Sequence, residues 1–359
     1  MNNQFLKACR REKTDYTPVW LMRQAGRYME EYRAIRSKHS FLTMCKTPEL
    51  AAEVTLQPIR KFALDAAIIF ADILLPLEGM GIKLEFAHNE GPVIHNPVRN
   101  KSDVNSIRLI EPERDVPFLM EAIKIVRREL NGKIPLIGFS GAPFTIASYI
   151  IEGGHSRNYI NTKSLMYNNP TLWHTLMDKI AKIIIRYLKA QINAGAQVVQ
   201  LFDSWVGCLS PFDYEKFVAP YSKQVIDGIK PVVSKAKALS RAKGNPTDSI
   251  PVIHFGTDSS NILELMKKAG GDVIGVDWRI ELDVAWKRLG YDVAIQGNLD
   301  PVVLFATPKE IEKRVQYVLD KAGGRQGHIF NLGHGILPNT PVENVITLIE
   351  TVHKYSRKN

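Results

Sequence analysis

The sequence predicts an α/β protein of the (β/α)8, or TIM, barrel class, with residues 1–359 forming a single domain. Two observations support this prediction. Eight short apolar segments recur along the whole chain, and segments with the apolar spacing of helices lie between them. Each apolar segment is continuous rather than alternately apolar and polar, which is typical of parallel strands buried on both faces. Eight strands alternating with helices favour a closed barrel over a doubly wound sheet.

The strand candidates are bounded by turn residues. The first four are PVWLM from Pro18, AAIIFADIL from Ala66, IPLIGFSG from Ile134 and AQVVQLFDS from Ala196. The last four are IPVIHFG from Ile250, DVIGVDW from Asp272, VAIQGNL from Val293 and HIFNLGHG from His328.

Two of the intervening segments carry clear helix signals. Residues 171–192 repeat apolar residues on one helical face: Trp173, Leu176, Met177, Ile180, Ile184, Tyr187 and Leu188. A second helix is expected after Thr307 as N-cap, with Pro308 in its first turn, Glu310 completing a capping box and Gly323-Gly324 at its end. Thr47-Pro48 repeats the Thr-Pro opening.

Two stretches depart from the regular alternation. Residues 79–112 are too long for one loop, and the alternation in IKLEF and PVIHNPV predicts a hairpin, followed by a helix that starts near Pro112. Residues 234–249 are basic and read as a lengthened helix end with a flexible loop. We expect neither stretch to divide the chain into separate domains.

Charge and composition restrict the class of partner. The chain carries 47 basic and 37 acidic residues, a formal net charge of +10, which suits an anionic partner. No cluster of five or six consecutive basic residues supports nucleic-acid binding. The chain lacks an apolar run of about 18 residues, which a membrane span needs, and its first residues lack the apolar core of a signal peptide.

Cysteine usage points to a reducing compartment. Cys9, Cys45 and Cys208 are widely separated, odd in number and form no CxxC pair, so neither a disulfide framework nor a cysteine-based zinc site is expected. We therefore expect a cytoplasmic protein that crosses no membrane and binds no metal.

In a barrel of this class, chemistry gathers at the carboxyl ends of the strands, here called the rim. Arg23 and Arg27 follow the first strand candidate, and would share one face if that segment were helical. The other polar groups expected at the rim are Asp72, Tyr149, Asp203 with Ser204, His254, Asp277 and, between two glycines, His334.

Each of these residues also has an ordinary structural interpretation. Arg23 and Arg27 could be solvated surface cations, Asp72 or Ser204 could cap a turn, Tyr149 could belong to the core, and His254 could be a satisfied buried histidine. Several independent caps would not be expected to converge on one rim, so a functional interpretation is favoured.

The rim inventory indicates the ligand chemistry. Two arginines bind carboxylates, and one central carboxylate accepts hydrogen bonds from N–H donors and stabilises nearby positive charge. No glycine-rich phosphate loop of the GxGxxG or Walker type precedes a helix, and no Ser-His-Asp or Cys-His motif stands out for acyl transfer. The pattern therefore favours a ligand with many carboxylates outside and N–H donors at its centre.

Five motifs, in order, resemble the uroporphyrinogen decarboxylase family: PVWLMRQAGRYM, AAIIFADIL, GFSGAPFTIASYIIEGG, LFDSW and NLGHGILP. The resemblance runs from near Thr17 to beyond Pro338. It implies substrate-binding roles for Arg23, Gln24, Ala25, Gly26, Arg27, Asp72, Tyr149, Ser204 and His334.

The resemblance also implies a reaction. Four acetate carboxyl groups of uroporphyrinogen III, an octacarboxylate tetrapyrrole, would leave as CO2 to give coproporphyrinogen III, with no metal or organic cofactor and with a homodimer as the family precedent. Asp72 would accept the pyrrole N–H groups and stabilise a protonated pyrrole. The catalytic candidates are Asp72, Arg23, Arg27 and His334, and the proton donor stays open between Arg23, water and His334.

Two rival functions are considered. Corrinoid-dependent methyltransferases share the fold but bind zinc through a histidine and cysteines, whereas the chain reads His254-Phe255-Gly256 where His-x-Cys would be needed. A basic RNA-binding barrel would explain the net charge of +10 but leaves the polar rim unexplained.

Overall fold

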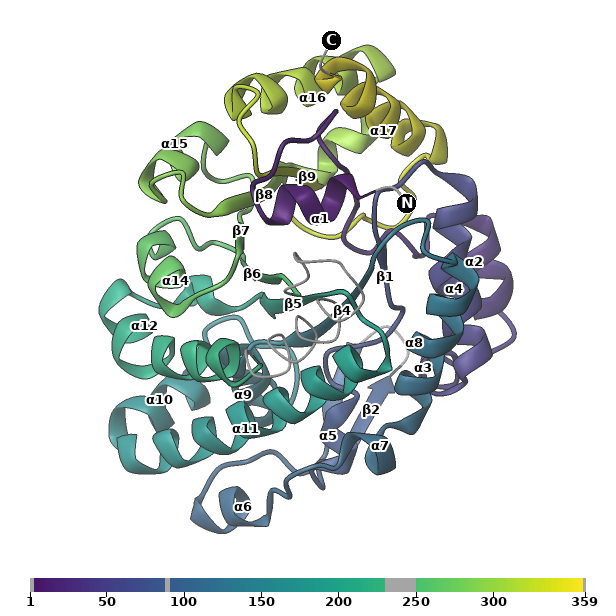
Figure 1. Cartoon of the computed structure of the whole chain (residues 1–359). Coiled ribbons are helices and arrows are strands. Elements are labelled where there is room, and N and C mark those ends of the chain that lie inside the picture. The colour runs from purple at the N-terminus through teal and green to yellow at the C-terminus, as the bar shows by residue number, and fades with distance from the viewer. Residues whose placement is uncertain (1–2, 88–90, 230–249, 358–359) are drawn as a thin grey trace, which may run out of the picture.

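The computed structural model describes residues 3–87, 91–229 and 250–357. A parallel seven-stranded sheet curls around the centre and helices surround it (Figure 1). The strands, in their order across the sheet, are β1 (Ala67–Ile68), β4 (Leu136–Gly141), β5 (Val198–Asp203), β6 (Val252–Gly256), β7 (Val273–Gly275), β8 (Ala294–Leu299) and β9 (His328–Leu332). The predicted α/β barrel class is confirmed.

The ring closes through residues 18–22, which lie between β9 and the start of β1. Val19 forms a parallel bridge with Phe330, whose N–H donates to the Pro18 carbonyl at 2.9 Å. On the other side, the Asp65 N–H donates to the Val19 carbonyl at 2.9 Å. The first strand candidate occupies its expected position, but the expectation of a full strand was wrong: only Val19 pairs. Pro18 has no N–H to donate, and the Val19 N–H goes to a side chain instead of a neighbouring strand.

That side chain belongs to Asp65, which is almost fully buried. Its carboxylate accepts from the Val19 N–H, from the Tyr16 hydroxyl and from Nε2 of His353, each at 2.8 Å. His353 lies on the last helix, α17 (Val342–Ser356). One buried carboxylate therefore connects the irregular barrel segment, the segment before β1 and the outer helix layer.

Helix α1 (Gln4–Cys9) lies against β9 and closes the amino end of the barrel (Figure 1, purple). Its buried Phe5 and Leu6 belong to a cluster with apolar residues from the strands: Ile137, Val198, Ile253, Val273, Ala294 and Ile329. Further along the interior, Trp20 Nε1 donates to Gln296 Oε1 at 2.9 Å, and Gln296 Nε2 donates to Gln200 Oε1 at 3.2 Å. The amino end and the middle of the barrel are filled, which leaves the rim for chemistry.

The outer helices follow the strand alternation. Those of the first half are α2 (Glu30–Arg36), α3 (Phe41–Lys46), α4 (Pro48–Lys61), α5 (Pro76–Gly79), α6 (Lys101–Ser106), α7 (Pro112–Asp115), α8 (Pro117–Leu130), α9 (Pro143–Glu152), α10 (Ile160–Asn168) and α11 (Pro170–Ala194). Those of the second half are α12 (Pro211–Phe217), α14 (Leu263–Ala269), α15 (Leu282–Arg288), α16 (Pro308–Ala322) and α17, with short 3-10 turns at Val206–Cys208 and Pro301–Phe305. Residues 219–229 are also helical.

The strongest helix predictions agree with the structure. All seven apolar positions expected on the inner face of α11 are buried. Thr307 caps α16 by accepting from the Glu310 N–H at 3.4 Å, and Gly323 ends it with φ 63°. The Glu310 carboxylate pairs with Arg314 at 2.8 Å rather than reaching back to complete a capping box.

The stretch 79–112 contains an antiparallel pair, β2 (Leu84–Ala87) and β3 (Gly91–Ile94). The Ile94 N–H donates to the Gly153 carbonyl at 2.8 Å, and the Val98 N–H donates to the Ile150 carbonyl at 2.8 Å, so the strand pair is attached to the end of α9. The expected loop at 234–249 lies outside the described residues.

The Asp65 contacts generate a stability prediction. Asp65→Ala leaves the buried Val19 N–H without an acceptor and removes the His353 contact, so we expect the free energy of unfolding to fall by about 3 kcal/mol. Urea denaturation of both proteins measures the change. Asp320→Ala is the control: Asp320 is exposed and accepts from Tyr355 on a neighbouring helix, and its loss should cost less than about 1 kcal/mol. Equal losses in the two variants would contradict the role assigned to Asp65.

Candidate active site

Residues 22–28 turn back on themselves rather than forming a helix, and α2 begins only at Glu30. Arg23 has φ 59°, a left-handed conformation that a right-handed helix cannot contain. The condition under which Arg23 and Arg27 would share a helical face is therefore not met. Both side chains are nevertheless exposed.

Gln24 holds this loop in place. Its buried side chain accepts from the Leu21 N–H and donates to the Ala66 carbonyl, both at 3.2 Å. The Tyr28 hydroxyl donates to the Gln24 carbonyl at 2.7 Å. Ala25 and Gly26, next in the chain, are half-buried. The amide of Gln24 is thus engaged within the protein, whereas Arg23 and Arg27 are exposed.

The loop after β9 packs directly on Arg23. A Cβ added at Gly335 would lie 2.5 Å from Arg23 Cδ and 2.7 Å from Cγ, so only glycine leaves room for this side chain without a shift. The Ile336 N–H donates to the Met22 carbonyl at 2.9 Å. The first and last barrel segments therefore bring Arg23 and His334 to the same part of the rim.

His334 is half-buried, and its Nδ1 accepts from the Gly335 N–H at 2.7 Å. Burial, with the positive charges of Arg23 and Arg279, lowers the pKa of His334 to about 4. The ring is therefore neutral near pH 7, with its proton on Nε2, where it can donate to a ligand.

Asp72 follows β1 and is half-buried. Its Oδ1 accepts from the Leu74 N–H at 2.8 Å, so one oxygen does stabilise a turn. Burial raises the pKa of Asp72, while the Leu74 N–H and the charge of Arg23 oppose that rise. Arg23 thus acts electrostatically on both Asp72 and His334.

Tyr149, on α9, is the third group on which the charge of Arg23 acts, after Asp72 and His334. Burial and the charge of Asp72 raise the pKa of Tyr149 to about 12, against the opposing charge of Arg23. Its ring stacks on Trp205 with centroids 3.8 Å apart. Ser204, directly before Trp205, is half-buried, and its carbonyl accepts from the Thr257 hydroxyl. Trp205, which packs on Tyr149, was not singled out from the sequence.

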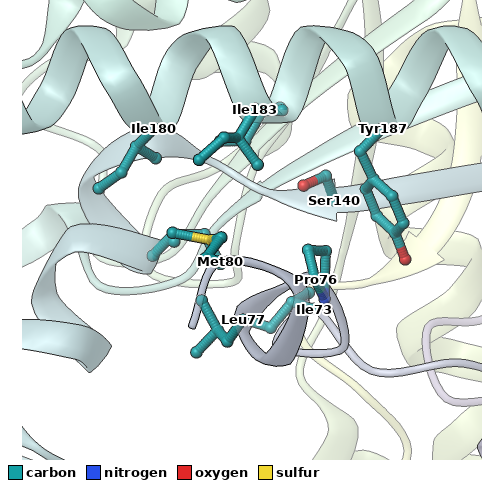
Figure 2. A pocket seen from close by; sticks show the side chains of 10 residues that line it. Ile73, Pro76, Leu77, Met80, Ser140, Ile180, Ile183 and Tyr187 are labelled. Atoms are coloured by element: carbon teal, nitrogen blue, oxygen red, sulfur yellow. The ribbon is translucent and has the colours of Figure 1, made fainter. Parts of the chain in front are cut away.

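A small apolar cavity lies behind the loop that carries Asp72. Figure 2 shows Ile180, Ile183 and Tyr187 of α11 on one side, with Leu77 and Met80 on the other. Ile73, the residue after Asp72, also lines it. The lining is mostly apolar, so the cavity offers no site for an anionic ligand.

Three other polar groups expected near the rim are buried and bond to other groups of the protein. Asp203 is buried, accepts from the Thr145 hydroxyl at 2.8 Å, and has its pKa raised to about 7 by burial. His254 is fully buried, with Nδ1 3.3 Å from the Gly270 carbonyl, and burial lowers its pKa to about 4. Asp277 is buried and pairs with Arg279 at 2.7 Å.

Among the described residues, no group of three or more His, Cys, Asp or Glu side chains is arranged to hold a metal ion. Cys9 and Cys45 are buried, and Cys208 lies in the short 3-10 turn after β5. In the same described part of the chain, no helix combines the length and apolarity needed to cross a membrane.

The family model described as uroporphyrinogen decarboxylase (URO-D) matches residues 1–355. The chain belongs to this family. A uroporphyrinogen decarboxylase of Carboxydothermus hydrogenoformans is 63% identical over 99% of the chain and 97% of the relative, and one of Geobacter sulfurreducens is 52% identical over the full length of both.

Among solved structures, a methyltransferase from Methanosarcina mazei superposes with a TM-score of 0.77 over 99% of the chain and 98% of its own length, at 18% identity. That likeness extends to the fold alone. The family assignment therefore depends on the family model and the sequence relatives.

The environment of His334 generates a titration prediction. NMR of the imidazole should show a neutral ring protonated on Nε2, with a midpoint near pH 4. Between pH 6.5 and 4 the unfolded chain takes up a proton that the folded chain does not, so this histidine's contribution to stability is lost as the pH falls through that range. His334→Gln identifies the resonance, and a midpoint at or above 6.5 would contradict the geometry.

Proposed function

We propose that this chain decarboxylates the four acetate side chains of uroporphyrinogen III to give coproporphyrinogen III. One observation supports this most directly: a single half-buried carboxylate, Asp72, stands within the electrostatic influence of an exposed arginine, Arg23. A cyclic tetrapyrrole with N–H groups at its centre and carboxylates around its edge complements that arrangement.

The binding roles follow from donor and acceptor chemistry. Asp72 Oδ2 accepts the pyrrole N–H groups, because Oδ1 already accepts from Leu74. Arg23 and Arg27 bind substrate carboxylates, and Ala25 and Gly26 contact the substrate through the backbone. Gln24 supports that loop. Tyr149, Ser204 and the Nε2–H of His334 complete the contacts around the macrocycle.

Each decarboxylation begins with protonation of a pyrrole carbon, which turns the ring into a cationic electron sink. The C–C bond to the acetate carboxylate then breaks, CO2 leaves, and the electron pair returns to the ring. A second proton adds to the exocyclic carbon to give a methyl group, as the ring carbon loses its proton. Asp72 stabilises the cationic ring in the transition state.

The protonation state of His334 reduces the number of candidate proton donors. A neutral ring whose pKa is about 4 holds no transferable imidazolium proton near pH 7. Arginine, with a reference pKa above 12, is a poor acid. We therefore favour water, held between Arg23 and a substrate carboxylate, over either side chain.

The reaction as written needs no metal or organic cofactor, because the protonated pyrrole takes up the electrons of the breaking bond. We propose a cytoplasmic homodimer that binds neither nucleic acid nor membrane, with the net charge of +10 assisting capture of the anionic substrate. A chelator should leave turnover unchanged. Loss of decarboxylation on metal removal would instead show that the reaction needs a bound metal.

The role of Asp72 is tested by anaerobic incubation with uroporphyrinogen III and separation of products by carboxylate number. Asp72→Asn should slow turnover by at least about 100-fold, because the amide lacks the charge that stabilises the cationic ring. Asp320→Asn on α16 is the control and should match the unchanged enzyme. If the folded Asp72→Asn variant turns over substrate at the normal rate, the role of Asp72 is excluded. If the unchanged enzyme does not turn over uroporphyrinogen III, the proposed function is overturned.

The electrostatic effect of Arg23 on Asp72 gives a pH prediction. Protonating Asp72 removes the catalytic charge, so kcat/KM should fall on the acid side with the pKa of Asp72. Arg23 opposes the rise in that pKa. Arg23→Gln should therefore move the acid limb of kcat/KM to higher pH, besides weakening binding. An acid limb that stays in place would mean that another group controls it.

A further inference from the structure

Arg279 is a rim cation that the sequence analysis did not single out. It follows β7, and its side chain is 43% exposed. Nη1 pairs with the buried Asp277 at 2.7 Å, and Nε pairs with the exposed Asp258 at 2.6 Å. The guanidinium lies 4.2 Å from the centre of the Trp278 ring. These contacts leave three of its five N–H donors available.

The loop that carries Arg279 is firmly held. Asp277 accepts from the Asp258 N–H at 2.7 Å and from the Arg279 N–H at 3.1 Å. Asn298 Nδ2 donates to the carbonyls of Asp277 at 2.9 Å and Ile280 at 2.7 Å. The orientation of the guanidinium is therefore largely set before a ligand arrives, which reduces the entropy lost on binding.

This loop also borders the loop of His334. A Cβ added at Gly333 would lie 2.6 Å from the backbone nitrogen of Trp278, so the two backbones are in direct contact. The charges of Arg23 and Arg279 both lower the pKa of His334. His334 is thus within the electrostatic reach of two arginines that come from different barrel strands.

We propose that Arg279 is a further carboxylate-binding residue of the rim, which holds an acidic side chain of the substrate beside His334. This inference rests on the proposed function, in which the substrate carries eight carboxylates and Arg23 and Arg27 can bind only some of them. Asp277 belongs to the folded loop, because it accepts two backbone N–H groups. Asp258 is 52% exposed, so it is the partner that a substrate carboxylate would displace.

A purely structural role makes different predictions. If Arg279 serves only to tie the loops after β6 and β7 together, loss of either partner should disturb the site in the same direction. If Arg279 binds substrate, its removal should weaken binding, whereas removal of the competing Asp258 should leave binding unchanged or strengthen it. Asn suits position 258, because it tolerates the left-handed backbone there, with φ 52°.

The test measures binding and turnover separately. Uroporphyrin, the stable oxidised octacarboxylate, is titrated against each protein by fluorescence, and uroporphyrinogen III turnover gives kcat and KM. Arg279→Gln should raise Kd and KM roughly tenfold with little change in kcat, the result of losing a charged hydrogen bond made equally in ground and transition states. Arg279→Lys should recover part of the loss, and Asp258→Asn should bind at least as tightly as the unchanged protein.

Arg60→Gln is the matched control, because Arg60 also pairs with a carboxylate, Glu53, but lies on the outer helix α4. An unchanged Kd in Arg279→Gln, or weakened binding in both Arg279→Gln and Asp258→Asn, would overturn the inference. The proposed function stands if the unchanged protein turns over substrate in either case. Failure of turnover in the unchanged protein overturns the proposed function, while the uroporphyrin Kd values still decide the role of Arg279.

Discussion

The barrel depends on a side-chain hydrogen bond at a place where its backbone ladder is incomplete. Segment 18–22 pairs with β9 through Val19 alone, and Asp65 accepts the Val19 N–H that would otherwise be left unpaired in the interior. Because Arg23 follows this segment directly, the same contact anchors the chain from which the loop of Arg23 begins. Stability and chemistry are therefore linked at this point of the ring.

Arg23 opposes the effect of burial on the pKa of Asp72 and adds to the effect of burial on the pKa of His334. Its positive charge favours the ionised form of Asp72 and disfavours the protonated form of His334. The charge of Arg23 therefore favours an anionic acceptor at Asp72 and a neutral donor at His334, a combination that suits a ligand presenting both N–H groups and carboxylates. Gly335 makes this possible, because any side chain there would collide with the stem of Arg23.

The barrel class was predictable because continuous apolar segments and amphipathic helices alternate along the whole chain, and the inner face of α11 could be read from spacing alone. The irregular conformation of segment 18–22 was not predictable, because it depends on Asp65 and His353, which are distant in sequence. At the rim, Arg23, Asp72 and His334 lie just after barrel segments, as expected from the strand ends, and Tyr149 lies on α9, the helix after β4. The turn at Arg23, the stacking of Trp205 and the orientation of Arg279 depend on contacts between loops, which no local pattern encodes.

The Asp65 contacts also affect the order in which the protein can assemble. Asp65 and His353 are 288 positions apart, and the Thr17 N–H donates at 2.8 Å to the hydroxyl of Ser356, 339 positions away. A ribosome delivers residues 16–65 long before it delivers α17. During synthesis the early segment cannot make its contacts with α17 until that helix emerges, so full closure of the ring becomes one of the last events of folding.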